Sequence, residues 1–483
     1  MRIIKASTLL LTCAAMIAAG YRGTVAARQG GAAARQSGRP PNIIVILADD
    51  QGYGDLGSYG HPTIRTPNID RLAAEGQRWT SFYAAPVCTP SRAQLLTGRL
   101  AIRTGLAAGV LFPDSTGGLQ QSEVTIAEVL KARGYATAAV GKWHLGVLPE
   151  YLPTSQGFDS YFGIPYSNDM GWTGAPIPGV QRLDSFQNPL IANFNVPLMR
   201  NDRIVERPAD QTTITKRYTD EGIAFIKAHR SQPFFLYLAH NLPHVPLFRS
   251  KAFEGKSQRG LYGDVVEEID ANVGRVIAAL RDLHIERQTL VVYMSDNGPW
   301  APYKDQGGSA GLLRGAKGST WEGGVRVPAI FWWPGTIRSS VVTGIGSELD
   351  LLQTFASLAG ARPPADRLLD GYDLSPTLRG DAPSPRQSLM YYSGATLSAV
   401  RRGSYKAHFS SPEPDAGADR GATAAAAPQL YNLDVDPSER FDIAGANAGV
   451  VAELRVMADE HKKTVVPVKD QIATRPSSTE PRQ

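Results

Sequence analysis

Short apolar runs alternate with amphipathic segments along the first two thirds of the chain. The continuous apolar runs are typical of strands buried on both faces, and they lie at 43–47, 135–140, 234–238 and 289–294. Helical patterns separate these runs, at about 66–76, 125–133, 214–229 and 264–282. Strands that alternate with helices predict an α/β fold, with a mostly parallel sheet flanked by helices on both faces.

The pattern changes after about residue 380. A small antiparallel sheet, followed by a helix near 448–462, is predicted by three segments. They are Tyr391-Tyr392, an alternating run near 398–409 and the segment 430–433. Residues 412–428 are rich in alanine and low in complexity, so we expect a flexible surface loop there. The sequence therefore predicts a smaller C-terminal subdomain after the α/β domain.

The N-terminus resembles an export signal. Arg2 and Lys5 precede an apolar stretch over 6–19, and small residues at 25–27 offer a cleavage point. The stretch is shorter than the roughly 20 residues of a membrane span, which favours a cleaved signal over an anchor, while Cys13 leaves a lipoprotein anchor open. We expect export machinery as a partner and a periplasmic or secreted protein.

The predicted organisation is a signal peptide at 1–27, a disordered leader at 28–41, a catalytic α/β domain at 42–380, a small C-terminal α+β subdomain at 381–465 and a polar tail at 466–483.

Charge and cysteine content narrow the function classes. The formal net charge of +5 falls to −1 without residues 1–40, which hold six basic residues and no acidic one, so no nucleic-acid partner is expected. Cys13 and Cys88 are the only cysteines, and the first is removed with the signal. The exported protein would then have no disulfide. Cys88 is therefore either buried and inert or present because it reacts.

Rare polar residues recur where the predicted strands end, at the edge where open parallel sheets bind ligands. They are Asp49, Asp50, Lys142, His144, His240, His244, Asp296 and Asn297. Any one of them could belong to a surface turn or a helix cap. Taken together, the carboxylates and the amide are hard oxygen ligands that suit calcium or magnesium better than zinc.

Cys88 stands at the amino end of a short helical segment that Pro90 would open. Free backbone N–H groups and the helix dipole favour negative charge at such an end by roughly 0.3–1 kcal/mol. Arg92, in the first turn, could reach the same spot. A buried structural cysteine beside a helix cap is the alternative.

Several motifs resemble those of the formylglycine-dependent sulfatases. Cys88-Thr89-Pro90-Ser91-Arg92 with Leu96-Thr97-Gly98-Arg99 is similar to the segment that a maturation enzyme reads before it oxidises the cysteine to formylglycine. Matching motifs follow the family's order over about 42–445, and they are Asp49 to Asp55, Gly141 to Gly146, Gly163 to Ser167, Asp296 to Gly298, Gly315 to Gly318, Leu369 to Pro376 and Leu430 to Glu439. The chain most resembles the group of arylsulfatase A and N-acetylgalactosamine-6-sulfatase, although Ser58 replaces an arylsulfatase A cysteine.

The resemblance implies an alkaline-phosphatase-like α/β fold and a set of site residues. It places calcium, rather than magnesium, on Asp49, Asp50, Asp296 and Asn297, with modified Cys88 also near the ion. Arg92 would steady the formylglycine hydrate, and His144 would contact it. Lys142, Lys317, Ser167 and His244 would bind the sulfate. His240 matches less clearly and is placed behind these residues.

The charges of this set explain its composition. A sulfate monoester must leave water, and an uncompensated buried anion is very costly. With three aspartates and sulfate on one side and Arg92, Lys142 and Lys317 on the other, a divalent cation supplies the missing positive charge. A formylglycine hydrate supplies one hydroxyl to attack sulfur and another to expel sulfate. We hypothesise that Asp296 activates the first, that His144 is the base for the second, and that His244 or Lys317 protonates the leaving alcohol.

The sequence thus predicts a hydrolase for small-molecule or carbohydrate sulfate esters. A phosphoesterase of the same superfamily is one alternative, since related folds use serine or threonine with metals. A non-catalytic sulfate-ester binder is another, and it would follow if Cys88 stays unmodified. Trp172, Trp300 and Tyr303 are aromatic residues of the predicted substrate loops, where they either pack or stack on a substrate ring.

Overall fold

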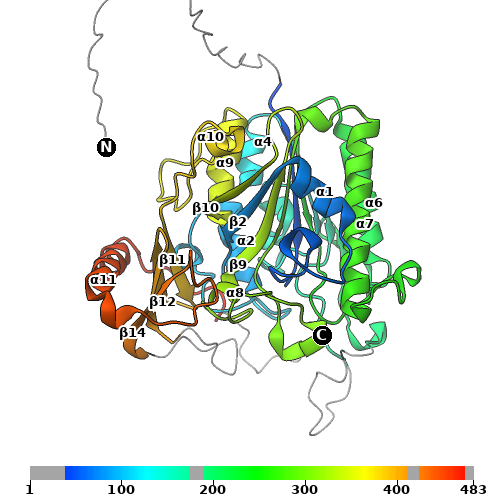
Figure 1. The fold of residues 1–483 in the computed structure, drawn as a ribbon. Helices are drawn as coiled ribbons and strands as arrows, with labels where there is room; N and C mark the ends of the chain where they lie inside the picture. The colour runs from blue at the N-terminus through cyan, green and yellow to red at the C-terminus, as the bar shows by residue number, and fades with distance from the viewer. Residues whose placement is uncertain (1–38, 174–185, 187–188, 412–423, 474–483) are drawn as a thin grey trace, which may run out of the picture. The chain divides into compact units, whose positions relative to one another are not determined.

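The computed structural model describes residues 39–173, 186, 189–411 and 424–473, and from Pro40 onward they belong to one compact unit (Figure 1). The predicted signal peptide, almost all of the leader, most of the low-complexity loop and the last ten residues of the tail lie outside the described residues. Within the described part, no helix is both long and apolar enough to cross a membrane.

A ten-stranded sheet forms the centre of the molecule, in the order β10-β2-β9-β8-β1-β7-β3-β4-β5-β6. Its strands are β1 (Asn42–Ala48), β2 (Gln77–Tyr83), β3 (Ala136–Gly141), β4 (Ser160–Gly163), β5 (Leu198–Arg200), β6 (Arg203–Glu206), β7 (Phe234–Ala239), β8 (Thr289–Ser295), β9 (Arg326–Trp332) and β10 (Ser340–Ser347). The five neighbours from β8 to β4 are all parallel, which confirms the predicted mostly parallel sheet.

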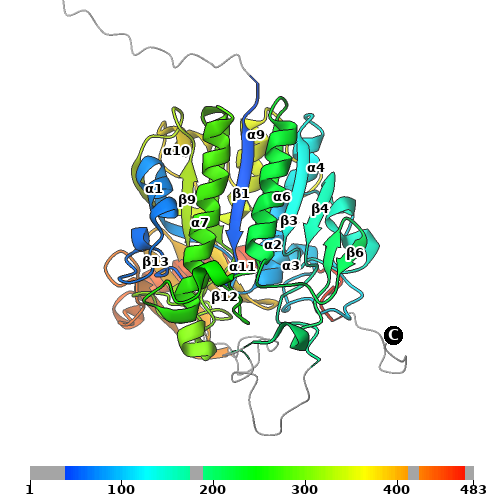
Figure 2. The same ribbon diagram turned by 90° about the vertical axis from the view of Figure 1, so that its right-hand side faces the viewer.

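Helices cover both faces of this sheet (Figure 2). One face is covered by α1 (Pro67–Glu75), α6 (Ile214–His229) and α7 (Gly260–Asp282), and the other by α2 (Cys88–Thr97), α4 (Ile126–Lys131) and α9 (Leu351–Leu358). Other α-helices among the described residues are α3 (Ala101–Thr104), α8 (Glu322–Val325), α10 (Ser375–Arg379) and α11 (Ala448–Lys463).

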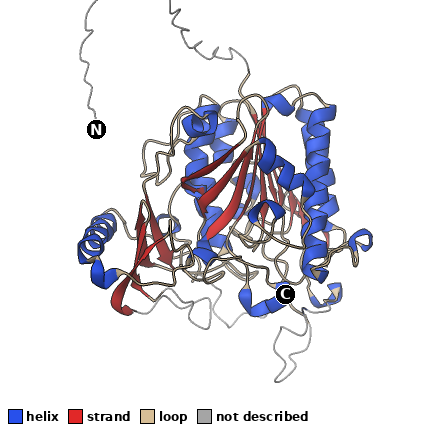
Figure 3. Cartoon of the chain, in the orientation of Figure 1, coloured by secondary structure: helices blue, strands red, loops and turns tan. Residues whose placement is uncertain are grey.

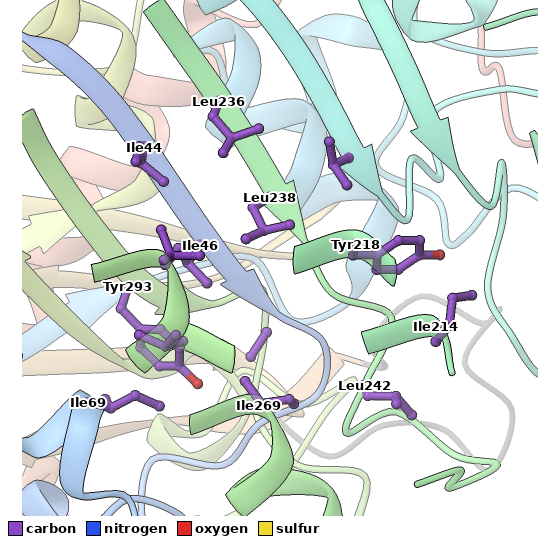
Figure 4. Close-up of a cluster of buried hydrophobic side chains, with 14 of the residues drawn as sticks. Ile44, Ile46, Ile69, Ile214, Tyr218, Leu236, Leu238, Leu242, Ile269 and Tyr293 are labelled. Carbon is purple, nitrogen blue, oxygen red and sulfur yellow. The ribbon is translucent and has the colours of Figure 1, made fainter. Parts of the chain in front are cut away.

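The two layers bury alternate residues of β1. Ile44 and Ile46 pack with Leu236 and Leu238 of β7 under α6 and α7 (Figure 4). The other residues of β1 face the opposite core, and they are Ile43, Val45 and Leu47. Full burial of each such side chain contributes about 1.5–3 kcal/mol, which explains why β1 is apolar throughout. This packing fixes the position of β1 in the sheet, and therefore the position of the polar residues that follow it.

A separate four-stranded antiparallel sheet follows, as predicted (Figure 3). Its strands are β11 (Ser388–Ser393), β12 (Thr396–Arg402), β13 (Tyr405–Ser410) and β14 (Ala424–Asn432). The alternating run near 398–409 is two strands, because Gly403 takes a left-handed conformation and turns the chain between them. Residues 424–428 were expected in the loop but belong to β14. Leu454 and Ala458 of α11 pack on this sheet, against residues that include Val400.

Candidate active site

The parallel pairing of β1 with β8 brings the first two acidic segments together. Ala48 is the register partner of Ser295, so Asp49 and Asp50 leave β1 beside Asp296. The backbone N–H of Asp50 donates to Asp296 Oδ1 at 3.1 Å, and Asn297 Nδ2 donates to Asp50 Oδ1 at 2.7 Å. All four side chains are buried. Residues far apart in the sequence thus form one cluster of oxygen atoms.

Cys88 is the first residue of α2, and its side chain points at this cluster. Its Sγ lies 3.4 Å from Asp49 Oδ1 and 3.8 Å from Asp50 Oδ1. The cysteine stands at the amino end of the helix, as predicted, although the helix begins at Cys88 itself and not at Pro90. One turn later, Arg92 donates to Asp296 Oδ2 from Nε at 3.1 Å and from Nη2 at 2.9 Å. The helix therefore brings a thiol and a cation to the same carboxylates.

Lys142 and His144 enter the site from the end of β3. Gly141 has φ 111°, and a Cβ there would lie 1.8 Å from the carbonyl oxygen of Ala239, so only glycine fits where the chain leaves the strand. Lys142 Nζ donates to Asp49 Oδ2 at 2.6 Å. His144 Nε2 lies 2.9 Å from the Leu111 carbonyl oxygen, to which it donates. Nδ1 of His144 is then an acceptor, and it has no partner among the described residues.

His244, Ser167 and Lys317 complete the cluster from three further segments. Ser167 Oγ lies 3.2 Å from Lys142 Nζ and 3.4 Å from His244 Nε2. His244 Nε2 lies 3.5 Å from Asp50 Oδ2, which also accepts from Lys317 Nζ at 2.8 Å. The structure therefore gathers every predicted metal, nucleophile and sulfate-binding residue at one edge of the sheet.

His240 differs from these residues. It is fully buried after β7, its ring lies 6.4 Å from that of Tyr218, and neither ring nitrogen has a hydrogen-bond partner among the described residues. Burial lowers the pKa of His240 to about 4, so the imidazole is neutral. No contact in the described structure ties His240 to the ligand cluster.

A buried acid behind Cys88 was not predicted from the sequence. Glu348 accepts a hydrogen bond from Ser91 Oγ at 2.5 Å and from the Ala85 N–H at 3.0 Å, and Ser91 also contacts the Asp296 carbonyl oxygen. Burial raises the pKa of Glu348 well above its usual value. These contacts fasten the start of α2 to the end of β8. Of the residues in these contacts, only Ser91 could be singled out from the sequence, because it lies inside the cysteine motif.

Opposite charges balance in the site. Burial alone would raise the pKa of Asp49, but neighbouring charges, Lys142 first among them, lower it well below its usual value. Burial and the Asp49 charge raise the pKa of Asp296 to about 6. Burial raises the pKa of the Cys88 thiol, which is therefore protonated. Three carboxylates face three cations.

The two histidines of the site are neutral, whereas Lys317 stays charged. Burial, followed by the charge of Lys142, lowers the pKa of His144 well below its usual value. Burial and the charge of Lys317 lower the pKa of His244. Although burial opposes it, the Asp50 carboxylate raises the pKa of Lys317. Of these three groups, Lys317 is thus the one that is positively charged near neutral pH.

The donor set fits a metal ion. One ligand atom from each of Asp49, Asp50, Cys88 and His244 lies within 4.8 Å of the others. Oδ1 of Asn297 is buried and accepts no hydrogen bond within the described residues, although a buried amide oxygen normally has a partner. A cation beside Asp50 would satisfy this oxygen. Carboxylate and amide oxygens favour a hard cation such as calcium or magnesium.

Comparison with known proteins agrees with this geometry. Residues 41–361 match the family described as Sulfatase, and residues 384–482 match the C-terminal region of aryl-sulfatase. Arylsulfatase A of Homo sapiens is 45% identical over 442 residues, covering 86% of each chain. N-acetylgalactosamine-6-sulfatase of Sus scrofa is 40% identical over 476 residues, covering 90% of this chain and 88% of that protein. The crystal structure of Ps i-CgsB in complex with k-i-k-neocarrahexaose is 30% identical, with a TM-score of 0.76, and covers 91% of this chain and 96% of that one.

The fold and the cluster together define a hydrolytic enzyme that has an α/β architecture and a buried metal-binding site. The chain belongs to the sulfatase family. It is an arylsulfatase-like enzyme that acts on sulfate esters.

Proposed function

We propose that this sulfatase hydrolyses organic sulfate monoesters, aryl or carbohydrate, with formylglycine made from Cys88 as its nucleophile. The observation that carries the proposal is the placement of Cys88 Sγ, which is buried at the first residue of α2 against Asp49 and Asp50. Anionic groups are stabilised at such a helix end. Formylglycine, when formed and hydrated, supplies an attacking hydroxyl and a second hydroxyl whose deprotonation releases sulfate.

The sulfate-binding role is assigned to Lys142, Ser167, His244 and Lys317. Lys142 and Lys317 approach the carboxylates of Asp49 and Asp50 from different segments, and Ser167 lies between Lys142 and His244. Lys142, Lys317 and Ser167 present N–H and O–H donors to one small region, whereas neutral His244 donates from Nδ1 to the Val245 carbonyl oxygen and faces this region with an unprotonated Nε2. A sulfate held there lies beside residue 88, and its negative charge is met by two ammonium groups.

Proton transfer is assigned from the directions of the pKa shifts. With a pKa of about 6, Asp296 can accept a proton from the attacking hydroxyl near neutral pH. His144 is neutral with Nδ1 as acceptor, which suits the base that promotes release of sulfate. The lowered pKa of His244 favours Lys317 as the group that protonates the leaving alcohol.

Calcium is the proposed cation, held by Asp49, Asp50, Asp296, Asn297 and the oxygen of modified Cys88. When bound, it offsets the negative charge of the sulfate group. We propose calcium over magnesium because calcium accepts irregular sets of carboxylate and carbonyl oxygens, whereas magnesium demands a near-ideal octahedron.

Mass spectrometry of the tryptic peptide from Trp79 to Arg92, taken from protein made in its native host, tests the nucleophile directly. Loss of sulfur and two hydrogens with gain of one oxygen at Cys88 is the expected result. An intact thiol in active protein would refute the proposal. An intact thiol in inactive protein would instead identify an unmatured enzyme or a non-catalytic binder.

Hydrolysis of phosphate esters is the competing activity, because phosphoesterases share the fold. Turnover of 4-nitrophenyl sulfate and 4-nitrophenyl phosphate by the same preparation separates the two. We expect the sulfate to be strongly preferred, and a Cys88→Ala variant to lose this activity while remaining folded. Preference for the phosphate would overturn the assignment.

Export is proposed from the N-terminal pattern alone. Arg2 and Lys5 before an apolar stretch, with small residues at 25–27, support removal of a signal peptide and a periplasmic or secreted mature enzyme. A formylglycine-generating maturation enzyme is the second proposed partner. N-terminal sequencing of the mature protein tests the first point, and a start at Met1 would contradict it.

A further inference from the structure

Trp300 lies directly beside the sulfate-binding residues. Lys317 Nζ is 4.3 Å from the centre of its indole ring, a cation–π contact, and the ring of His244 lies 5.2 Å away at an interplanar angle of 53°. Trp300 follows Asp296-Asn297-Gly298-Pro299 along the chain, so the segment that leaves β8 carries both a ligand cluster and this indole.

Exposure increases from the carboxylates outward to Trp300. The side chains of Asp49 and Asp50 are 0% and 3% exposed, those of His244 and Lys317 are 3% and 9% exposed, and Trp300 is partly exposed. Lys317 and His244 each contact both Asp50 and Trp300. The indole is therefore more exposed than the two side chains that it contacts, as a residue that meets the alcohol portion of a bound ester would be.

Backbone hydrogen bonds hold Trp300 in this position. Its N–H donates to the Gly307 carbonyl oxygen at 2.8 Å, and its carbonyl oxygen accepts from the Tyr303 N–H at 3.1 Å. The N–H of Lys317 donates to the Pro299 carbonyl oxygen at 2.9 Å, which ties the two segments together. The Tyr303 ring packs against the indole, with centroids 4.7 Å apart. The aromatic surface is thus formed before substrate arrives, which lowers the entropy cost of binding.

The other two aromatic residues of these loops have different neighbours. Trp172 packs edge-on against Phe194, and Tyr303 packs between Trp300 and Phe186. Both stand beside an apolar core cluster. Trp300 joins the same cluster but also contacts two sulfate-binding side chains. This double contact is what a substrate-binding wall requires.

We propose that Trp300 is a specificity-determining residue that binds the ring to which the sulfate is attached. The inference rests on the proposed function and adds the class of leaving group: a six-membered ring, either a planar aryl ring or a pyranose that presents its C–H face. Both present an apolar face that stacks on indole, and an aromatic pair of this kind contributes about 0.5–1.5 kcal/mol.

Steady-state kinetics of Trp300→Ala and Trp300→Phe test this role. With 4-nitrophenyl sulfate and N-acetylgalactosamine 6-sulfate as separate substrates, we expect Trp300→Ala to raise KM roughly three- to tenfold for the ring that stacks. Trp300→Phe retains a ring face and should recover most of the loss. The inhibition constant of inorganic sulfate, which has no leaving group, should change less than twofold in both variants. Trp172→Ala is the matched control and should leave all these constants within twofold.

The outcomes separate cleanly. A rise in KM for one substrate alone identifies whether the stacked ring is aryl or sugar, and a rise for both supports a general ring wall. No rise for either substrate overturns the inference, as does an equal rise in the sulfate inhibition constant, which would mean that Trp300 acts through Lys317. If formylglycine is absent from active protein, the proposed function itself fails, whatever Trp300 does.

Discussion

The guanidinium of Arg92 joins three segments that carry site residues. Besides its two bonds to Asp296, it donates from Nη1 to the Lys142 carbonyl oxygen at 2.6 Å, and its Nη2 lies 3.7 Å from Asp49 Oδ2. The side chain is fully buried. Arg92 therefore holds the ends of β1, β3 and β8 at fixed distances, and its positive charge offsets that of the carboxylates there.

Replacement of Arg92 by methionine should destabilise the protein by about 3–5 kcal/mol, because it leaves Asp296 buried without its cation. Urea unfolding measures this loss, and turnover of 4-nitrophenyl sulfate should fall with it. The double variant Arg92→Met, Asp296→Asn should recover part of the stability but none of the activity. If the Arg92→Met variant were as stable as the parent, the Arg92–Asp296 pair would not stabilise the fold.

His240 should make the protein sensitive to acid. Its pKa is about 4 in the folded protein against an ordinary value of 6.5, so the unfolded chain binds a proton that the folded one refuses. Stability is then lost as the pH falls below 6.5. His240→Leu should remove about 2 kcal/mol of the difference in unfolding free energy between pH 7 and pH 5. Urea unfolding at both pH values tests this, and an unchanged difference would contradict it.

Individual site residues could be predicted where the end of an apolar run marks the end of a strand. Asp49 and Asp50 follow a run of five apolar residues, and no polar residue interrupts that run, so the edge of the sheet could be located. The contact between Asp50 and Asp296 could not be predicted, because it depends on β1 and β8 being neighbours in the sheet. Glu348 had no local pattern that marked it as buried.

At the scale of elements, the loop that carries Lys317 depends on the C-terminal sheet. Lys406 of β13 donates from Nζ to the Thr320 carbonyl oxygen at 2.7 Å and to Glu322 Oε1 at 2.9 Å, and it lies 3.0 Å from Glu439 Oε1. Glu439 in turn accepts from the Glu322 N–H at 2.7 Å. The charged side chains are buried. This network fixes the segment between Lys317 and α8.

Lys406→Met should therefore weaken sulfate binding at a distance. We expect a loss of about 3–5 kcal/mol in stability, because Glu322 and Glu439 lose their shared cation. The inhibition constant of inorganic sulfate should also rise as the Lys317 loop loosens. Lys463→Met, which breaks only an exposed pair with Glu460, is the matched control and should change neither value. Lost stability with an unchanged inhibition constant would limit Lys406 to a structural role.

The elements that the sequence failed to predict have mixed patterns. β2 carries Gln77, Arg78 and Thr80 among its apolar residues, since it lies near one edge of the sheet, beside β10, and is not apolar throughout as β1 is. The antiparallel insertion of β9 between β2 and β8 is a long-range pairing with no local signal. The parallel centre was predictable because full burial on both faces requires continuous apolar runs.

At the scale of the whole molecule, the bound cation should contribute to stability. A ligand that binds only the folded state adds about 2.7 kcal/mol at a concentration one hundred times its Kd. We expect a chelator to lower the melting temperature and calcium to restore it. Asp50→Asn, which removes one charged ligand, should respond to neither. A parent protein that is indifferent to both additions would contradict the proposed calcium site.

The burial of Cys88 limits when another enzyme can modify its thiol. Its side chain is 1% exposed, so an enzyme cannot reach the thiol once the sheet has closed. Because β1 pairs with β7 and β8, which are synthesised much later, the centre of the sheet stays open while Cys88 is already available. If Cys88 is converted to formylglycine as proposed, its maturation would belong to the interval between synthesis and folding. A chain that folds first should keep its thiol when incubated with the maturation enzyme, whereas the unfolded chain should be converted.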